Sequence, residues 1–382
     1  MEDIKRVKLS EIVELITKGT TPTTLGYEFQ DEGVNFLKIE CFDENGGFIE
    51  SKVAHISEEC HKKMKRSQLK NGDILFSIAG AIGRVAIVTE EMLPANINQA
   101  LAIIRISDEQ VYLPYIKLIL TSPIVIEQFE RKKQGVAQLN LSLKDINEIS
   151  IPLPSKDKQI ELAELFDKVV GVISKRNKEL SALDDLIKAR FVEMFGNPVT
   201  NEKGWNQKQL GEITTKLGSG ATPKGGKEAY QEDGITLIRS MNVHNGLFEY
   251  KELAHISEEQ ATKLDNVTIE ENDVSLNITG ASVARSCVVP SKILPARVNQ
   301  HVCIIRCNQR IVPEFLNKLL IDDNYQRLLW SIARGGATRE AITKQQVESL
   351  KIIVPPIELQ NQFADFVHQV DKSKVTVQKA FE

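Results

Sequence analysis

An internal repeat constrains this chain more than any other feature of its sequence. Short motifs from the first half return in the second half at an offset of 200–201 residues, and they keep their order. The matched pairs include His55–Glu59 and His255–Glu259, Pro22 and Pro223, Asn98–Gln99 and Asn299–Gln300, and Pro154 and Pro355. The period is far longer than that of a solenoid unit. Each copy is therefore a whole domain with an appendage, and the two domains should present similar surfaces.

Composition places the chain among ordinary globular proteins. Its 382 residues are 42% hydrophobic and 26% charged, which favours two or three domains. The sequence contains no stretch of about 18 apolar residues, so it predicts no membrane span, and the first residues lack the apolar core of a signal peptide. The five cysteines have no disulfide spacing, which favours a reducing compartment. We therefore expect a cytoplasmic protein with no membrane partner.

The net charge of −4 does not by itself indicate a nucleic-acid partner. No segment is strongly basic. If the chain binds DNA, either a local face must attract the phosphates or a partner chain must supply much of that attraction.

Each copy has an α+β pattern, with short apolar runs separated by turn residues. The expected strands are 73–78, 84–88 and 100–105 in the first copy, and 274–278, 284–289 and 302–306 in the second. Helices are expected near 113–133 and 313–333. Ser142 with Asp145, and Thr343 with Gln346, fit N-terminal capping boxes. A strand punctuated by proline then closes each copy, at 149–154 and 350–356.

A long helix follows the first copy. Residues 158–195 contain no proline, and apolar residues stand seven apart, which is typical of a coiled-coil seam. Such a helix would span about 57 Å, too long for a compact domain. A second helix runs from about residue 357. The predicted seam residues are Phe166, Ile173, Leu180, Ile187, Met194, Phe363 and Val370. The two helices either pair with each other in antiparallel fashion or pack onto another chain.

The residues do not assemble a recognisable catalytic site. The stretch Gly218–Gly226 lacks the Gly-Lys-Ser/Thr step of a phosphate loop. Nuclease-like Asp…Glu-x-Lys patterns occur in both copies, but the repeat register sets Glu50 opposite Tyr250 rather than Glu249, and such a slip reverses the face of a strand. The cysteines and histidines show no metal-ligand spacing. We expect buried cysteines, and a structural rather than catalytic role for His55 and His255.

In order and in duplicate, the motifs closely resemble the specificity subunit of type I restriction–modification systems. They are Gly-Thr-Thr-Pro22, Asn-Gly-Asp-Ile-Leu75 leading to Ala-Gly-Ala-Ile-Gly-Arg84, Asn98-Gln99 and Ile-Pro-Leu-Pro154, with their counterparts in the second copy. The resemblance covers essentially the whole chain. Two features depart from the family pattern. Lys158 and Leu359 stand where the family usually has a glutamate before the glutamine at the helix start. The turn Gly280–Arg285 also lacks the second glycine that its counterpart has just before Arg84.

The resemblance implies an architecture of two homologous mixed α/β target recognition domains separated by long helices that form an antiparallel coiled coil with pseudo-two-fold symmetry. The expected boundaries are 1–155 and 198–356 for the domains, and 156–197 and 357–382 for the helices. It also implies a non-catalytic subunit whose domains each read half of a bipartite double-stranded DNA target. The helices would set the spacing and dock two methyltransferase subunits.

Partner chains would carry the chemistry of restriction, modification and phage defence. The resemblance implies that S-adenosylmethionine, ATP and Mg²⁺ serve the methyltransferase and motor–nuclease subunits, and that this chain binds no cofactor or metal. Two other hypotheses remain open at this stage. One is a two-headed protein-interaction scaffold without DNA binding, and the other is a fused enzyme.

Polar and basic residues in loops at equivalent places of both copies are the candidates for base readout. They are Thr20, Thr21, Lys38, Arg84, Gln138, Asn140, Thr222, Lys224, Arg239, Arg285, Arg334, Thr338 and Arg339. Two basic runs are candidates for phosphate contact: Lys62, Lys63, Lys65 and Arg66, and Arg131, Lys132 and Lys133.

Overall fold

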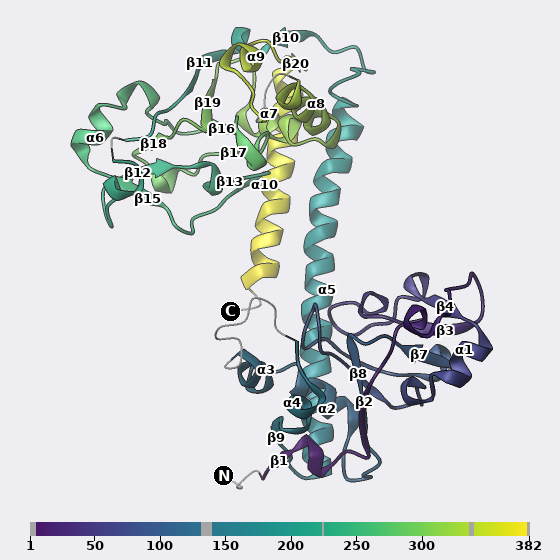
Figure 1. The fold of residues 1–382 in the computed structure, drawn as a ribbon. Coiled ribbons are helices and arrows are strands. Elements are labelled where there is room, and N and C mark those ends of the chain that lie inside the picture. Colours follow the sequence, from purple (N-terminus) through teal and green to yellow (C-terminus); the bar gives the residue numbers. More distant parts are fainter. Residues whose placement is uncertain (1–4, 131–139, 224, 336–339, 380–382) are drawn as a thin grey trace. The chain divides into compact units, whose positions relative to one another are not determined.

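The computed structural model describes residues 5–130, 140–223, 225–335 and 340–379 (Figure 1). Its contacts divide the chain into two compact units, Met1–Ser174 and Lys175–Glu382. The division falls inside one continuous helix, α5 (Lys156–Phe195). No helix among the described residues combines the length and the apolar character needed to cross a membrane.

The globular part of the first unit combines two sheets. An antiparallel four-stranded sheet has the order β2-β8-β5-β6, and a mixed three-stranded sheet has the order β4-β3-β7 with β3 and β7 parallel. The strands are β2 (Leu15–Lys18), β8 (Leu101–Arg105), β5 (Ile74–Ser77), β6 (Val85–Ile87), β4 (Ala54–Ile56), β3 (Val34–Leu37) and β7 (Ala95–Ile97). A separate pair joins β1 (Arg6–Lys8) to β9 (Ser150–Pro152). The helices are α1 (Glu58–Lys63), α2 (Leu113–Leu120), α3 (Pro123–Glu130) and α4 (Leu143–Asn147).

The second unit repeats this topology. Its four-stranded sheet has the order β11-β19-β16-β17, and its three-stranded sheet the order β15-β12-β18. The strands are β11 (Thr214–Ser219), β19 (Val302–Cys307), β16 (Val274–Asn277), β17 (Ser286–Val288), β15 (Ala254–Ile256), β12 (Ile235–Ile238), β18 (Ala296–Val298), β10 (Gln207–Gln209), β20 (Lys351–Ile353), β13 (Val243–His244) and β14 (Leu247–Phe248). The helices are α6 (Glu258–Thr262), α7 (Pro313–Leu320), α8 (Asp323–Arg334), α9 (Lys344–Glu348) and α10 (Ile357–Lys379). The α+β prediction with two homologous domains is confirmed.

Each predicted helix after the third strand is in fact two helices. In the first unit the break precedes Pro123, whose ring disfavours helical geometry in the residue before it. In the second unit Asp322 starts α8, because its carboxylate accepts hydrogen bonds from the backbone N–H groups of Asn324 and Tyr325. Both predicted capping boxes are present, at Ser142 and Thr343.

A buried ion pair occupies the same place in both domains. Asp73 is 1% exposed and accepts two hydrogen bonds from Arg105, at 2.7 and 2.6 Å. Asp273 is fully buried and accepts two from Arg306, at 2.9 and 2.8 Å. The carboxylates raise the pKa of both guanidinium groups through these hydrogen bonds. The ion pair links the start of β5 to β8 in the first domain, and the start of β16 to β19 in the second.

A buried glutamine anchors each long helix to its domain. Gln159 Oε1 accepts from the backbone N–H of Tyr112, and its Nε2 donates to the carbonyls of Gln110 and Pro154. Gln360 repeats all three bonds with Val312, Arg310 and Pro355, at 2.8, 3.1 and 2.8 Å. Since a buried amide needs partners for both its donor and its acceptor, this explains why both copies place glutamine at the helix start.

Within the second unit α10 packs antiparallel against the last part of α5 (Figure 1). The ring of Phe363 lies 5.5 Å from those of Phe191 and Phe195, while Lys374 Nζ, eleven residues further along α10, lies 2.5 Å from Asp184 Oδ1. The seam residues Ile187, Phe363 and Val370 are buried there, and Met194 packs against them.

The seam prediction extends further along α5 than this packing does. Leu180 is half-buried, whereas Phe166 and Ile173 are 48% and 41% exposed. In the antiparallel register that sets Lys374 beside Asp184, their partner positions would fall beyond Lys379, where α10 ends among the described residues.

Candidate functional site

In each domain one edge gathers the ends of several strands. The parallel strands β3 and β7 end together at Leu37 and Ile97, so that Lys38 and Asn98 emerge side by side. The second domain repeats this with Arg239 and Asn299, whose N–H donates to the carbonyl of Ile238. The carboxyl ends of neighbouring parallel strands are a common place for ligand contacts. We call these surfaces the first and second strand-end edges.

A glycine brings a threonine loop against each edge. A Cβ on Gly19 would stand 2.0 Å from the carbonyl oxygen of Ile97, and one on Gly220 would stand 1.7 Å from that of Val298. Only glycine permits this approach. The loop then places the Thr21 hydroxyl on Gln99 Oε1, and the Thr222 hydroxyl on Gln300 Oε1. Thr20, next in the loop, is exposed.

An aromatic ring and a cation form a second matched feature of the edges. Lys38 Nζ lies 4.9 Å from the centre of the Phe29 ring, and the Arg239 guanidinium lies 5.4 Å from the Tyr230 ring. Lys38 and Arg239 were predicted from the sequence, but Phe29 and Tyr230 were not. The signal that could have found them is their equal offset of 201 residues, beside the matched Gln30 and Gln231.

Three other predicted residues lie at separate places in the two domains. Asn140 is exposed, and the next residue donates its backbone N–H to the carbonyl of Ile78, which brings the loop to the end of β5. Arg334 is exposed at the end of α8 and lies over the Trp330 ring. Arg285 is half-buried just before β17.

Arg84 makes hydrogen bonds within its own domain. Its guanidinium donates to the carbonyls of Phe42, at 3.0 Å, and Ile39, at 3.5 Å, and so holds the turn that follows Lys38. The turn before Arg84 survives in the second domain without its glycine, because Ala284 adopts the left-handed φ of +71° where Gly83 has +87°.

Several predicted residues lie outside the described part of the chain. They are Arg131, Lys132, Lys133, Gln138, Lys224, Thr338 and Arg339.

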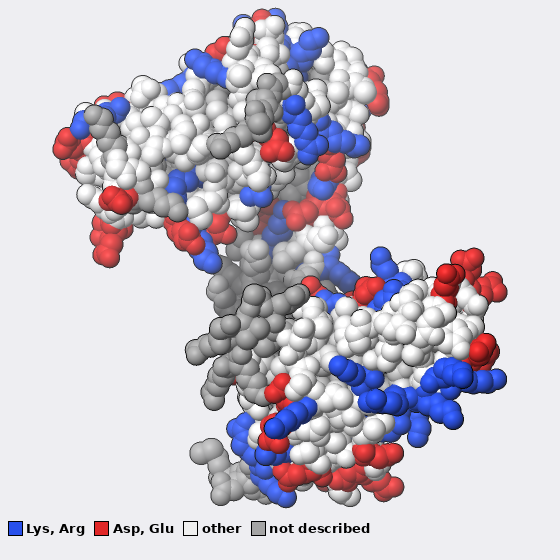
Figure 2. Space-filling model, viewed as in Figure 1, with Lys and Arg blue, Asp and Glu red and all other residues white. Residues whose placement is uncertain are grey.

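The first domain carries an exposed basic strip made of Lys62, Lys63, Lys65 and Arg66, on α1 and the 3₁₀ turn Lys65–Ser67. Figure 2 shows blue side chains gathered over the region where Figure 1 labels α1. An antiparallel bridge between Gln68 and Asn96 places the residue two positions after the strip beside β7.

The second domain lacks this strip. By the repeat offset, Thr262, Lys263, Asp265 and Asn266 replace the four basic residues. Asp265 instead accepts a hydrogen bond of 2.6 Å from Arg297, whose side chain is mostly buried beneath it.

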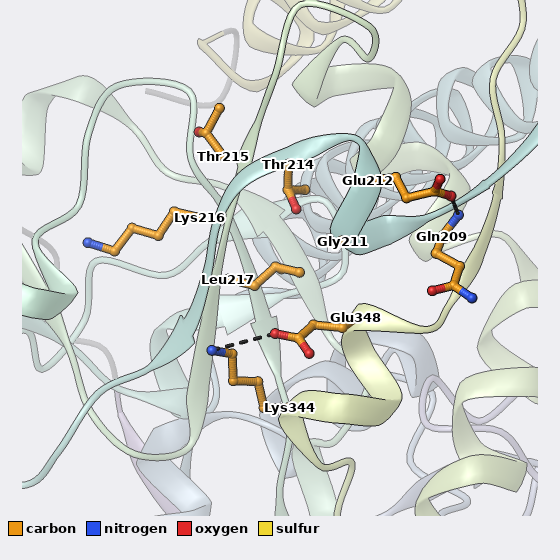
Figure 3. Close-up of a pocket in the computed structure, with 9 residues that line it drawn as sticks. All are labelled: Gln209, Gly211, Glu212, Thr214, Thr215, Lys216, Leu217, Lys344 and Glu348. Atoms are coloured by element: carbon orange, nitrogen blue, oxygen red, sulfur yellow. Dashed lines mark hydrogen bonds and ion pairs between the residues drawn. The ribbon is translucent and has the colours of Figure 1, made fainter.

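A pocket in the second domain does not resemble a catalytic centre (Figure 3). It lies at the start of β11, away from the strand-end edge, and three of its charged side chains make contacts within it: Lys344 lies 3.5 Å from Glu348, and Glu212 accepts the Gln209 N–H at 2.8 Å. Among the described residues no cluster of three or more His, Cys, Asp or Glu could hold a metal ion.

The cysteines also lack the features of a nucleophile. Burial raises the pKa of Cys287 to about 12 and that of Cys303 to about 11. These thiols stay protonated near neutral pH, whereas a nucleophilic cysteine needs a depressed pKa.

Comparison with known proteins places both repeats in one family. Residues 1–182 and 202–380 match the type I restriction modification DNA specificity domain. The EcoBI specificity subunit of Escherichia coli is 31% identical over 176 residues, which cover 44% of this chain and 36% of that protein. The putative MjaX specificity subunit of Methanocaldococcus jannaschii is 24% identical over 99% of this chain and 91% of that protein.

Solved structures share the fold. The S subunit of the type I restriction–modification system from M. genitalium superposes with a TM-score of 0.57 at 15% identity, covering all of this chain and 93% of that one. A chain from a study of assembly and conformational transition in a type I R-M system gives a TM-score of 0.58 at 17% identity, over 98% of this chain and 92% of that one.

Proposed function

Because the chain belongs to the type I restriction–modification DNA specificity family, we propose that each domain reads one half of a bipartite DNA target through its strand-end edge. The observation that carries the proposal is the matched construction of the two edges. Each combines a threonine on a glutamine with a cation over an aromatic ring. Amide and basic side chains are the groups that read base edges in the major groove.

The helices act as the spacer between the two half-sites. α5 contains 40 residues and so measures about 60 Å, against about 34 Å for one turn of DNA. A spacer of this length suits half-sites roughly one to two turns apart. The buried anchors Gln159 and Gln360 fix the start of each helix to its domain, which a ruler requires.

The same helix supplies a surface for the partner subunits. Along its first half α5 leaves a run of large apolar side chains 41–56% exposed: Leu165, Phe166, Val169, Val172 and Ile173. Large exposed apolar patches are typical of protein–protein contact sites. Two methyltransferase subunits dock on the helices, and motor–nuclease subunits join through the complex. S-adenosylmethionine, ATP and Mg²⁺ serve those partners, in the cytoplasm. This chain supplies specificity and no catalysis.

The methylation pattern of the host genome tests this function. Co-expression of the chain with its methyltransferase subunit should give methylated adenines in a single bipartite motif with a fixed gap. Deleting the chain should abolish that motif. Methylation that is independent of the chain, or a motif without a gap, would contradict the proposal.

Salt dependence distinguishes DNA reading from a scaffold without DNA binding. The assembled complex should lose DNA affinity steeply as salt rises, because phosphate contacts release counterions. Affinity that is absent or insensitive to salt would favour the scaffold.

A further inference from the structure

The second strand-end edge contains a chain of hydrogen-bonded side chains that the first edge lacks. The Thr222 hydroxyl donates to Gln300 Oε1, Gln300 Nε2 lies 3.0 Å from His301 Nε2, and His301 Nδ1 lies 2.5 Å from Thr279 Oγ1. The four residues come from three places in the fold: the loop after β11, the turn between β18 and β19, and the end of β16.

The order of donors in this chain follows from its first bond. With Gln300 Oε1 accepting from Thr222, the amide turns its NH₂ group toward His301 and donates to Nε2. The imidazole is then neutral, carries its proton on Nδ1, and donates to Thr279 Oγ1. The backbone around the ring is held as well, since His301 N donates to Asn299 Oδ1 and Ile278 N donates to the His301 carbonyl.

The hydrogen bonds between these side chains use only part of the hydrogen-bonding capacity of the Gln300 amide. Its side chain is exposed, and among the described residues each end of the amide makes one hydrogen bond. One N–H and one oxygen lone pair therefore remain. An amide with one donor and one acceptor free is the group that binds N7 and the N6 amino group of adenine together.

The first edge has the glutamine without this support. Gln99 accepts from Thr21, as Gln300 does from Thr222. Alanines stand at the two other positions, because Ala100 corresponds to His301 and Ala79 to Thr279. The oxygen end of the Gln99 amide is held, and neither alanine side chain can hold its nitrogen end.

We propose that His301, held by Thr279, is a positioning residue that fixes the Gln300 amide so that the second domain reads an adenine in the major groove. The inference rests on the proposed function and assigns a base to that domain. Pre-orienting a side chain lowers the entropy lost on binding and fixes which face of the amide meets the base.

The test uses the complete complex of the chain with its methyltransferase subunit, and duplexes that carry the wild-type methylation motif. Each adenine of the second half-site is replaced in turn by 7-deazaadenine, which lacks the N7 acceptor. At one position the wild-type complex should bind the deaza duplex about tenfold more weakly. Gln300→Ala should bind both duplexes equally.

The positioning role is tested with a matched pair of variants. Thr279→Ser keeps the hydroxyl and should keep the tenfold discrimination. Thr279→Ala and His301→Ala should reduce it to about threefold or less, while thermal unfolding and the recognition of the first half-site stay unchanged. A merely structural role would lower the unfolding temperature without changing discrimination between the two duplexes.

The reciprocal variant introduces a histidine held by a threonine into the first domain. Ala79→Thr combined with Ala100→His should sharpen readout at one position of the first half-site. Wild-type discrimination in His301→Ala, or a second half-site in which no adenine is sensitive to deaza substitution, would overturn the inference. If the wild-type complex showed no sequence-specific DNA binding, that result would instead contradict the proposed function.

Discussion

The two domains share a scaffold and differ at its edge. The buried pairs Asp73–Arg105 and Asp273–Arg306 occupy matching positions of the repeat and make the same hydrogen bonds, as do the anchors Gln159 and Gln360. The edges carry different groups: the first domain has the basic strip and small alanines, and the second has the His301 chain and a buried Arg297. This difference indicates that the residues that stabilise the fold are separate from the residues that would contact DNA. Substitutions in one set should therefore leave the other set intact.

The shared ion pairs should give the largest effects, equal in both domains. Asp73→Ala and Asp273→Ala each strand a mostly buried arginine, which should lower the free energy of unfolding by about 3–5 kcal/mol. Denaturant titration of the full chain measures this, and exposed Glu271→Ala serves as the control. A large loss in one domain and none in the other would break the equivalence of the scaffolds.

The helix anchor should come next. Gln360→Leu leaves the N–H of Val312 and two carbonyls without partners, which should cost about 2–3 kcal/mol. Gln362→Leu, on the exposed face of the same helix, is the matched control. Thermal unfolding should separate the two variants. Equal behaviour would mean that the anchor does not hold α10 to its domain.

The basic strip should distinguish the domains through salt. Replacing Lys65 and Arg66 by Ala should weaken DNA binding by the complex about tenfold and reduce the slope of log affinity against log salt by about 1.8, which is two phosphate contacts. Lys263→Ala, the remaining lysine at the corresponding place in the second domain, should change both quantities far less. If the two substitutions act alike, the electrostatic asymmetry is absent.

The aromatic–cation pairs should give the smallest effects. Phe29→Ala removes the ring beneath Lys38, and Tyr230→Ala removes the one beneath Arg239. Each should weaken binding of the complex by about 0.5–1 kcal/mol, confined to its own half-site. Leu247→Ala, a highly exposed residue on β14, is the control. Loss at both half-sites from one substitution would contradict separate readers.

The sequence repeat predicted the scaffold well, because the same physical constraint acts on both copies. Four strands of each copy, both capping boxes and the helix starts were predicted, and Lys38 with Arg239 came from the repeat comparison. The strands of the three-stranded sheets were not predicted. The breaks at Pro123 and Asp322 were missed, although a proline and an aspartate are both residues that favour the start of a new helix.

The same method hides residues that differ between the copies. His301 was not predicted because an alanine stands at its counterpart, although its contacts join three parts of the edge. Arg84 was predicted to contact DNA from its place after a glycine turn, and its hydrogen bonds to the carbonyls of Ile39 and Phe42 could not be read from sequence spacing. Residues that distinguish two half-sites are by nature the ones that a repeat comparison passes over.

The central claim is that each domain reads its own half of the target. Exchanging residues 1–155 for the corresponding domain of another specificity subunit tests this claim most directly, with methylated adenines mapped across the genome. The chimera should keep the gap and the half-site of residues 198–356, and replace only the other half-site. A motif altered in both halves, or in neither, would contradict the account.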